Sequence, residues 1–290
     1  MAKATNDLFL SSSGLATFGP EVVRIIELLE GCFLSWAEEF KADVMIFPPL
    51  VRVEDLNRLD YFRNFPHLGV FASRIQEGLI GDKYIEGGDV EVIPNEHLAD
   101  SKYALPSAAC YPVYLYLQNT VLDAPRCITT VGKCFRNEEY YRGLERLLCF
   151  SLREIVFVGG DEEVRLFLAR SKQKVLDFAA AIGLPLEVKV AGDPFYDSEG
   201  IRAKMQRRFP VKEELVYEGR LALASVNFHL SFFGERCNIR TGDEKFAFSA
   251  CVGMGIERWV HVLMERFNKD ISKIYDILQE QGKYGFTKAR

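Results

Sequence analysis

Residues 132–157 read GKCFRNEEYYRGLERLLCFSLREIVF, and the second half of this stretch alternates in the manner of a β-strand. In a strand, successive side chains point to opposite faces of the sheet. Glu154 would then share a face with the apolar set Phe150, Leu152, Val156 and Val158. A carboxylate in apolar surroundings is costly unless a positive group meets it. We therefore expect Glu154 to have a specific partner.

The rest of the chain surrounds this strand with further strands and with helices. Helical spacing of apolar residues predicts a helix after Pro20, one around Pro112 and one over residues 161–185. Asp161 is expected to cap the third of these helices and Gly183 to end it. Residues 198–209 are expected to form a basic helix and residues 256–267 a final one. Strands are expected at 43–51, 127–139, 146–160, 186–191, 220–233 and 244–253. Because strands often follow one another without a helix between them, the predicted class is α+β, with a mainly antiparallel sheet flanked by helices.

Composition narrows the class of protein. The chain has 290 residues and a net charge of −5, with 48% hydrophobic residues, which is typical of a globular protein of one large domain or two small ones. The acidic balance is a weak argument against nucleic-acid binding. We find no membrane-length apolar run and no signal-peptide pattern at the N-terminus, so a cytoplasmic location is expected. The seven cysteines are irregularly spaced without a CxxC pair, which favours reduced thiols over a disulfide framework.

Two short motifs indicate phosphate chemistry. Arg136 and Glu138 form an RxE pattern on the first strand of the expected hairpin, where an ordinary surface ion pair is the simpler interpretation. Gly253-Met254-Gly255 leads a strand directly into a helix whose first turn carries Arg258. Such a helix start favours a phosphate through its free N–H groups and its dipole. No Walker sequence and no third glycine of a dinucleotide fingerprint are present.

Taken together, FPPLV, KCFRNEE with RLLCFSLRE, and GMGIERW resemble motifs 1, 2 and 3 of the class II aminoacyl-tRNA synthetases, in that order. The seryl branch is the most similar, and the resemblance runs from about Pro20 to Phe267. It implies that Arg136 holds the α-phosphate of ATP and that Arg258 lies near the γ-phosphate, so that these two are the catalytic residues. It also implies an ATP-binding set made of Arg136, Glu138, Arg146, Phe150 and Arg258, with Glu138 and Phe150 at the adenine. Mg²⁺ is expected to accompany ATP, and the motif 1 resemblance implies a homodimer.

The resemblance also gives Glu154 a role. The seryl branch places an acid here beside the substrate amino group, and Cys110 and Cys251 lie at positions similar to those of the atypical, zinc-dependent seryl enzymes and their short relatives, the amino acid:[carrier protein] ligases. Cys110, Glu154 and Cys251 would be three zinc ligands, with a fourth position open for substrate. A structural role is the usual one for a lone histidine, so His229 is kept outside the metal shell. Whether His229 or Asn227 contacts substrate stays open.

The short relatives fit better than the tRNA-charging enzymes, because a synthetase catalytic domain accounts for residues 1–290 and leaves no coiled coil or anticodon-binding domain. We therefore expect a single domain with a helical insertion at about 193–216. The expected activity is ATP-dependent activation of a small amino acid, glycine or alanine being favoured, and its transfer to the phosphopantetheine thiol of an acidic carrier protein rather than to tRNA. A basic cluster on the insertion would dock the carrier: Arg202, Lys204, Arg207 and Arg208. The alternatives are a solvated helix face for that cluster, and, for the protein, a stand-alone enzyme that charges tRNA or an inactive regulatory paralogue.

Overall fold

The predicted hairpin lies within a seven-stranded sheet in the computed structural model, which describes residues 9–85 and 87–282. Neighbouring strands are antiparallel, apart from the pair at one edge, where a two-residue strand runs parallel to its neighbour. The predicted mainly antiparallel α+β fold is thus confirmed. In spatial order the strands are β10 (Leu186–Val190), β11 (Lys212–Tyr217), β12 (Leu221–Leu230), β14 (Phe248–Gly255), β9 (Cys149–Gly159), β8 (Arg126–Phe135) and β3 (Asp43–Val44).

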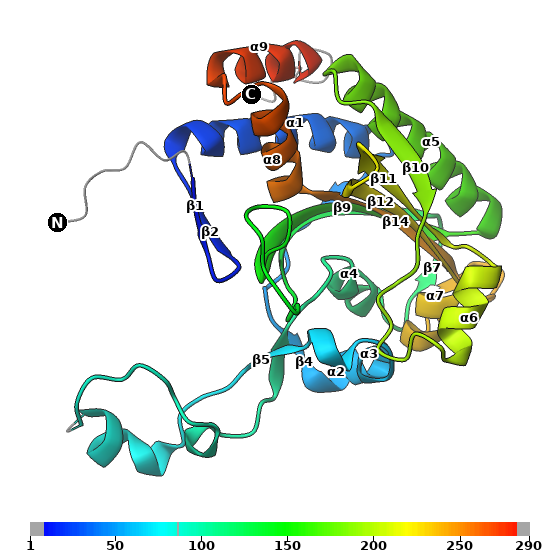
Figure 1. Ribbon diagram of the computed structural model, residues 1–290. Coiled ribbons are helices and arrows are strands. Elements are labelled where there is room, and N and C mark those ends of the chain that lie inside the picture. Colours follow the sequence, from blue (N-terminus) through cyan, green and yellow to red (C-terminus); the bar gives the residue numbers. More distant parts are fainter. Residues whose placement is uncertain (1–8, 86, 283–290) are drawn as a thin grey trace.

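Helices cover both faces of the sheet and create two apolar cores (Figure 1). One face is covered by α1 (Pro20–Glu39), α5 (Asp161–Ala181), α8 (Ile256–Arg266) and α9 (Ile271–Gly282). The other, more open face carries two short helices, α4 (Tyr111–Tyr116) and α7 (Phe232–Cys237). Glu154 lies on this second face, which leaves room for a site between the sheet and the segments in front of it.

The helix α1 illustrates how the local sequence produces the first core. Pro20 occupies its first turn, where a missing N–H costs nothing and a fixed φ favours the helix. Val22, Ile25, Leu29 and Phe33 then recur every three or four residues and are fully buried. The opposite side of α1 remains accessible to water. The helix expected after Pro20 is therefore confirmed.

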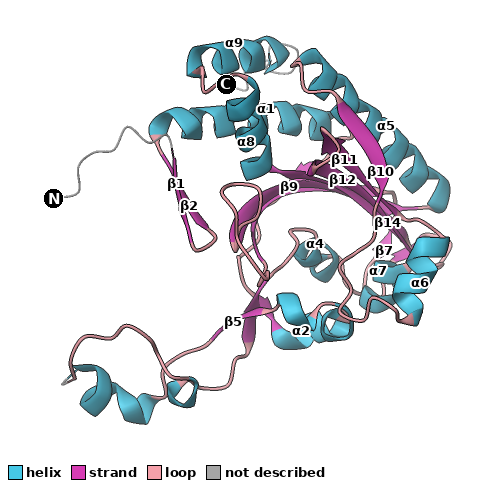
Figure 2. Ribbon diagram, viewed as in Figure 1, coloured by secondary structure: helices cyan, strands magenta, loops and turns pink. Residues whose placement is uncertain are grey.

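Smaller elements complete the fold. Three small sheets are the hairpin β1 (Phe9–Ser12) with β2 (Leu15–Phe18), the sheet of β4 (Val51–Arg52), β6 (Tyr103–Leu105) and β5 (Val70–Ala72), and the pair β7 (Val121–Leu122) with β13 (Arg240–Thr241). Three further helices are α2 (Val53–Arg58), α3 (Tyr61–Asn64) and α6 (Ile201–Arg208). Four short helical turns are η1 (Pro66–Leu68), η2 (Glu77–Leu79), η3 (Ile80–Ile85) and η4 (Asn95–His97). Residues 73–102, between β5 and β6, form a mostly irregular arm that projects from the body (Figure 2).

Several expected boundaries are wrong. The strand expected over 43–51 is interrupted: Asp43–Val44 form β3 and Val51 begins β4, and the two prolines between them cannot donate to a ladder. The helix at Pro112 ends at Tyr116, and Val121–Leu122 pairs as a strand instead. Gly160 rather than Asp161 occupies the N-cap of α5, where the Glu163 carboxylate accepts from its N–H. Strand β8 ends at Phe135, so Arg136 and Glu138 lie on the loop beyond it.

Residues 193–216, which are expected to form a helical insertion, follow β10 and include α6. Residues 212–217 form β11 and are part of the main sheet. Of the helices that the structure describes, none combines the length and the apolar character needed to cross a membrane. The expectation that the N-terminus has no signal peptide concerns mainly residues 1–8, and these residues lie outside the described part of the chain.

Candidate active site

Strand register brings Glu154 and Cys251 to the same face of the sheet. Glu154 on β9 pairs with Gly253 on β14, and Cys251 pairs with Val156, two residues further along. Paired residues of neighbouring strands point to the same side, and so do residues two apart on one strand. Cys110 occupies the N-cap of α4, which packs on this face. One Sγ from each cysteine and one carboxylate oxygen therefore all lie within 4.8 Å of one another.

This cluster is buried and contains an unsatisfied acceptor. Cys110, Glu154 and Cys251 are each at most 5% exposed. The Oε1 atom of Glu154 accepts from the Ala109 N–H at 3.2 Å, whereas Oε2 is buried without a hydrogen-bond partner among the described residues. Burial raises the pKa of the Glu154 carboxyl. Two thiols and one carboxylate, whose Oε2 is orphaned, make a set of three donors that suits Zn²⁺, whose ligand atoms lie roughly 3.3–3.8 Å apart in a tetrahedral site.

A cavity of about 650 Å³ opens from this cluster. The sheet supplies one wall, with Ser225, Asn227 and His229 alternating along β12. Asn227 lies directly opposite Cys251 and donates from Nδ2 to its Sγ at 3.5 Å and to Ser225 Oγ at 3.1 Å. Apolar residues on either side of α3, and others of α7 and the 193–211 segment, supply much of the remaining lining. The size is in the range of small-molecule sites.

The histidine of this cavity is tied to its wall. His229 Nδ1 lies 3.0 Å from the hydroxyl oxygen of Tyr114, and Nε2 lies 3.8 Å from Cys251 Sγ. Burial lowers the pKa of His229 to about 4, so the ring is neutral near pH 7. His229 is thus adjacent to the cluster but not part of it, since its nitrogens fall outside the 4.8 Å group.

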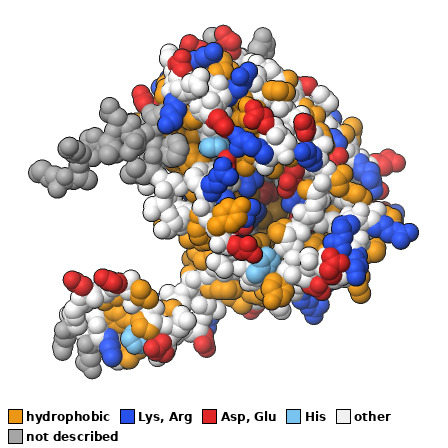
Figure 3. Space-filling model, in the orientation of Figure 1, with side chains coloured by type: hydrophobic (Ala, Val, Ile, Leu, Met, Phe, Trp, Pro, Cys, Tyr) orange, Lys and Arg blue, Asp and Glu red, His pale blue; other side chains and the backbone are white. Residues whose placement is uncertain are grey.

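A second, smaller cavity of about 120 Å³ lies beside the first. The complete ATP-binding set expected from the sequence lines it, namely Arg136, Glu138, Arg146, Phe150 and Arg258. Figure 3 shows Lys and Arg side chains gathered beside a hollow in the main body. Residues far apart in the sequence, from the β8–β9 loop and from α8, therefore form one pocket, whose lining includes four basic and four acidic side chains.

The cations of this pocket are held in defined positions. Arg136 donates from Nε to the Ser107 carbonyl at 3.1 Å, and its guanidinium lies 5.0 Å from the centre of the Phe150 ring. Arg146 pairs with Glu138 at 2.9 Å. Arg258 donates from Nε to the Glu145 carbonyl at 2.9 Å and from Nη1 to the Ala222 carbonyl at 3.0 Å.

The guanidinium groups of this pocket lie close enough to repel one another. Burial lowers the pKa of the Arg258 guanidinium, and the nearby positive charges of Arg136 and Arg146 lower it further. An anion that enters would relieve this repulsion, and oriented guanidinium groups bind phosphate oxygens well. The arrangement is therefore suited to a polyphosphate.

The two cavities share a wall. Arg136, Leu152, Ser225 and Gly253 line both of them, together with Lys212. A molecule in the larger cavity can thus meet a phosphate group in the smaller one beside Arg136. This contact between two sites is what a displacement reaction at phosphorus requires.

The basic residues expected to dock a carrier have different environments, although all four are exposed. Arg202 turns toward the larger cavity and pairs with Asp60 at 2.8 Å. Arg207 donates to the Ser198 carbonyl at 2.8 Å, and the Arg208 guanidinium lies 5.9 Å from the centre of the Phe209 ring. Lys204, Arg207 and Arg208 are outside both cavities.

Several lining residues were missed in the sequence. Ser225 and Lys212 line both cavities, and Asp193 lines the larger one with an ion pair to Lys212 at 3.2 Å. Glu257 and Glu145 line the smaller one. Ser225, Asn227 and His229 are spaced two residues apart, and this strand-like spacing could have indicated one wall of the larger cavity from the sequence. No comparable pattern marks Glu145, which belongs to an irregular loop.

The fold of this chain is similar to that of solved seryl-tRNA synthetases, which belong to class II. Seryl-tRNA synthetase of M. kandleri, solved with A. aeolicus tRNASec, superposes with a TM-score of 0.78 at 21% identity and covers 94% of this chain and 58% of that one. The Pyrococcus horikoshii enzyme, solved with ATP, gives 0.62 at 18% identity, over 87% of this chain and 53% of that one.

Curated proteins confirm the resemblance to the short ligases. The chain is 29% identical over 252 residues to amino acid–[acyl-carrier-protein] ligase 2 of Bradyrhizobium diazoefficiens, which covers 82% of this chain and 74% of that protein. Ligase 1 of the same organism is 27% identical over 271 residues, covering 88% and 81%. Type-2 serine–tRNA ligase of Methanocaldococcus jannaschii is 27% identical over 264 residues, but the match spans only 50% of that enzyme. No protein-family model matches the chain.

Proposed function

We propose that the protein is an ATP-dependent ligase that converts a small amino acid into an aminoacyl-adenylate and passes the acyl group to the phosphopantetheine thiol of a carrier protein. The observation that supports this most strongly is the shared wall at Arg136, where a cavity holding the cysteine–glutamate cluster meets a cavity lined by the ATP-binding set. The two relatives named amino acid–[acyl-carrier-protein] ligases support the choice of acceptor.

The first step is a displacement at phosphorus. A carboxylate oxygen of the amino acid attacks the α-phosphorus of ATP, the bond from that phosphorus to the bridging oxygen breaks, and pyrophosphate leaves. Arg136 would hold the α-phosphate and Arg258 the departing phosphates, with Mg²⁺ bound to ATP. Arg258 uses Nε and Nη1 for carbonyl groups, and Nη2 makes no hydrogen bond within the described residues. Fixed guanidinium groups stabilise charge as it develops.

The second step transfers the acyl group. The carrier thiol, as thiolate, attacks the carbonyl carbon of the adenylate, the carbon–oxygen bond to phosphate breaks, and AMP leaves. Cys110, Glu154 and Cys251 would hold Zn²⁺, which when bound supplies an open position for the amino group of the substrate. The exposed helix α6 would meet the carrier, since its basic side chains outside the cavities can attract an acidic surface.

Two assays in sequence test this proposal. We expect ATP–pyrophosphate exchange that depends on glycine or alanine when a panel of amino acids is offered. Single-turnover transfer should then load holo-carrier protein and leave tRNA uncharged. The type-2 serine–tRNA ligase match keeps tRNA charging as the second candidate, so loading of tRNA but not of holo-carrier would refute the ligase proposal. Absence of exchange with every amino acid would favour an inactive regulatory paralogue.

Reversing the charge at Arg207 and Arg208 to glutamate should slow transfer to the carrier about tenfold or more at low salt, because steering depends on complementary charge. Adenylate formation should be retained, since neither residue lines a cavity. The salt dependence of transfer, measured between low and physiological ionic strength, should become shallower.

A matched control is Lys269 and Lys273 reversed to glutamate, which changes net charge equally at an exposed site near α9. Equal slowing in both variants would mean that net charge rather than α6 governs the encounter. Unchanged transfer in the Arg207/Arg208 variant would place the docking surface elsewhere.

The homodimer is proposed to form through residues 20–51, with Pro48-Pro49 at the interface. In support, Val44, Ile46 and Leu50 expose large apolar side chains around these prolines, and Ile46 is 93% exposed. Replacing Ile46 by glutamate should shift the protein from dimer to monomer in light scattering at micromolar concentration. Leu166→Glu, at an exposed leucine of α5, is the control. A wild-type monomer with full activity would contradict the proposal.

A further inference from the structure

The loop between β8 and β9, residues 136–148, carries most of the ATP-binding set and needs to be held in place. It contains one isolated bridge, between Arg142 and Arg146, and otherwise lacks the regular ladder of a strand. Glu145 lies on this loop with a side chain only 15% exposed. Its carboxylate contacts no residue of the ATP-binding set. The burial of this acidic side chain therefore needs an explanation.

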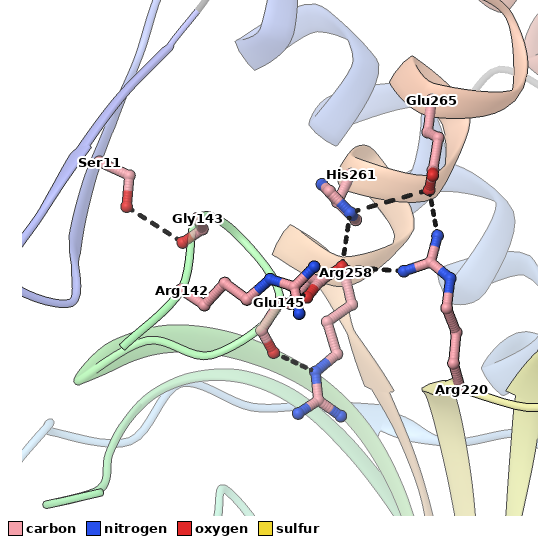
Figure 4. Close-up of polar contacts among 8 residues, drawn as sticks. All are labelled: Ser11, Arg142, Gly143, Glu145, Arg220, Arg258, His261 and Glu265. Atoms are coloured by element: carbon pink, nitrogen blue, oxygen red, sulfur yellow. Dashed lines mark hydrogen bonds and ion pairs between the residues drawn. The ribbon is translucent and has the colours of Figure 1, made fainter. Parts of the chain in front are cut away.

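The carboxylate of Glu145 joins three elements (Figure 4). Its Oε1 accepts from Arg220 Nη1 at 2.8 Å and lies 3.1 Å from His261 Nε2. Its Oε2 pairs with Arg142 Nε at 3.1 Å within the loop. Arg220 lies in the turn between β11 and β12 and also pairs with Glu265, and His261 and Glu265 both belong to α8. One side chain thus ties the loop to the turn and to α8.

The backbone of the same residue reaches a catalytic group. The Glu145 carbonyl accepts the Nε–H of Arg258, which fixes the plane of that guanidinium together with the Ala222 carbonyl. Ala222 follows Arg220 closely in the chain. The turn that carries Arg220 therefore leads directly to the residue that supplies the second acceptor of Arg258.

The other side of the loop rests on the β1–β2 hairpin. Ser11 Oγ donates to the Gly143 carbonyl at 3.0 Å, and the Gly14 carbonyl accepts from the Leu148 N–H at 2.8 Å. Gly14 has a φ of +77°, and a Cβ there would lie 2.6 Å from Leu148 N. The loop is thereby confined between the hairpin and α8.

We propose that Glu145, which lines the smaller cavity, is a positioning residue for nucleotide binding: it orients Arg258 through its carbonyl and the 136–148 loop through its carboxylate. This rests on the proposed use of the smaller cavity for ATP. Two arginines and a histidine surround the carboxylate, so it does not repel phosphate as an unpaired acid would. Charge-assisted hydrogen bonds of this kind are stronger than neutral ones.

Glu145→Ala is expected to raise the KM for ATP about tenfold and to lower kcat, with the KM for the amino acid unchanged. Arg220→Ala should show the same selective effect, and Glu145→Gln, which keeps acceptors for Arg220, a smaller one. Isothermal titration with Mg-ATP alone should show the weaker nucleotide binding independently of any amino acid. The control is Glu39→Gln, which removes the charge from a remote ion pair with Lys174 at 2.6 Å.

A coupling measurement separates positioning from general stability. In an Arg258→Ala background, Glu145→Ala should cause a smaller further loss than it does in the wild type, because one of the groups that it orients is gone. The positioning role would be overturned if the losses from the two substitutions were fully additive in this cycle. It would also be overturned if Glu145→Ala lowered the melting temperature but left ATP binding and the KM for ATP unchanged. If exchange is absent in the wild type but ATP binding still weakens in Glu145→Ala, the proposed reaction fails while this inference stands.

Discussion

Cys251→Ala protein is expected to purify without zinc and to show no amino-acid activation. The residue contributes one of three clustered donors, and its removal leaves one thiol and one carboxylate, too few to retain a structural or catalytic zinc ion. Because the metal would supply the open position for the amino group, its loss should abolish ATP–pyrophosphate exchange rather than only weaken folding. Metal content by plasma mass spectrometry and exchange rate are the two measurements, made also on Cys110→Ala and Glu154→Ala.

The matched control is Cys127→Ala, which removes a buried thiol from the core on the other face of the sheet. That variant should keep its metal and its exchange activity. Wild-type protein that is stoichiometrically free of metal and yet active would end the zinc proposal. In that case the three residues would form a buried cluster without a metal ion, in which burial keeps the carboxyl pKa raised.

Arg136→Ala and Arg258→Ala should each reduce the rate of adenylate formation by about 10²–10³-fold, as expected when one fixed donor to developing charge is lost at a cost of about 3–4 kcal/mol. Circular dichroism and thermal melting should show the fold intact. For Arg136 the effect should appear in exchange with every amino acid accepted, because the residue lies on the wall that both cavities share.

Conservative variants sharpen this test. Arg136→Lys keeps the charge but loses the planar fork of donors, so it should recover only part of the rate. Arg165→Ala, which removes an exposed arginine paired with Asp161 on α5, should leave the rate unchanged. Near-normal exchange in both alanine variants would mean that ATP binds elsewhere.

Local patterns in the sequence were sufficient for several elements of the fold. The alternation around Glu154 predicts β9 and the face that its side chain occupies, and the apolar spacing after Pro20 predicts α1. A glycine pair followed by apolar spacing places α8 directly after a strand. These features depend on contacts between residues a few positions apart, so the sequence contains the information. Boundaries were less reliable, as the two-residue β3 and the early end of α4 show.

The sequence by itself established the chemical types at the site and, through three motifs in order, the fold that would assemble them. The assembly was decided by tertiary structure: Cys110 and Cys251 approach Glu154 only because β9 pairs with β14 in one register and α4 packs on that face. A slip of one residue would turn Cys251 to the opposite core. The same holds for Glu145, whose partners Arg220 and His261 lie 75 and 116 residues away in the chain. Pairing between distant segments depends on packing across the whole sheet, which no local period encodes.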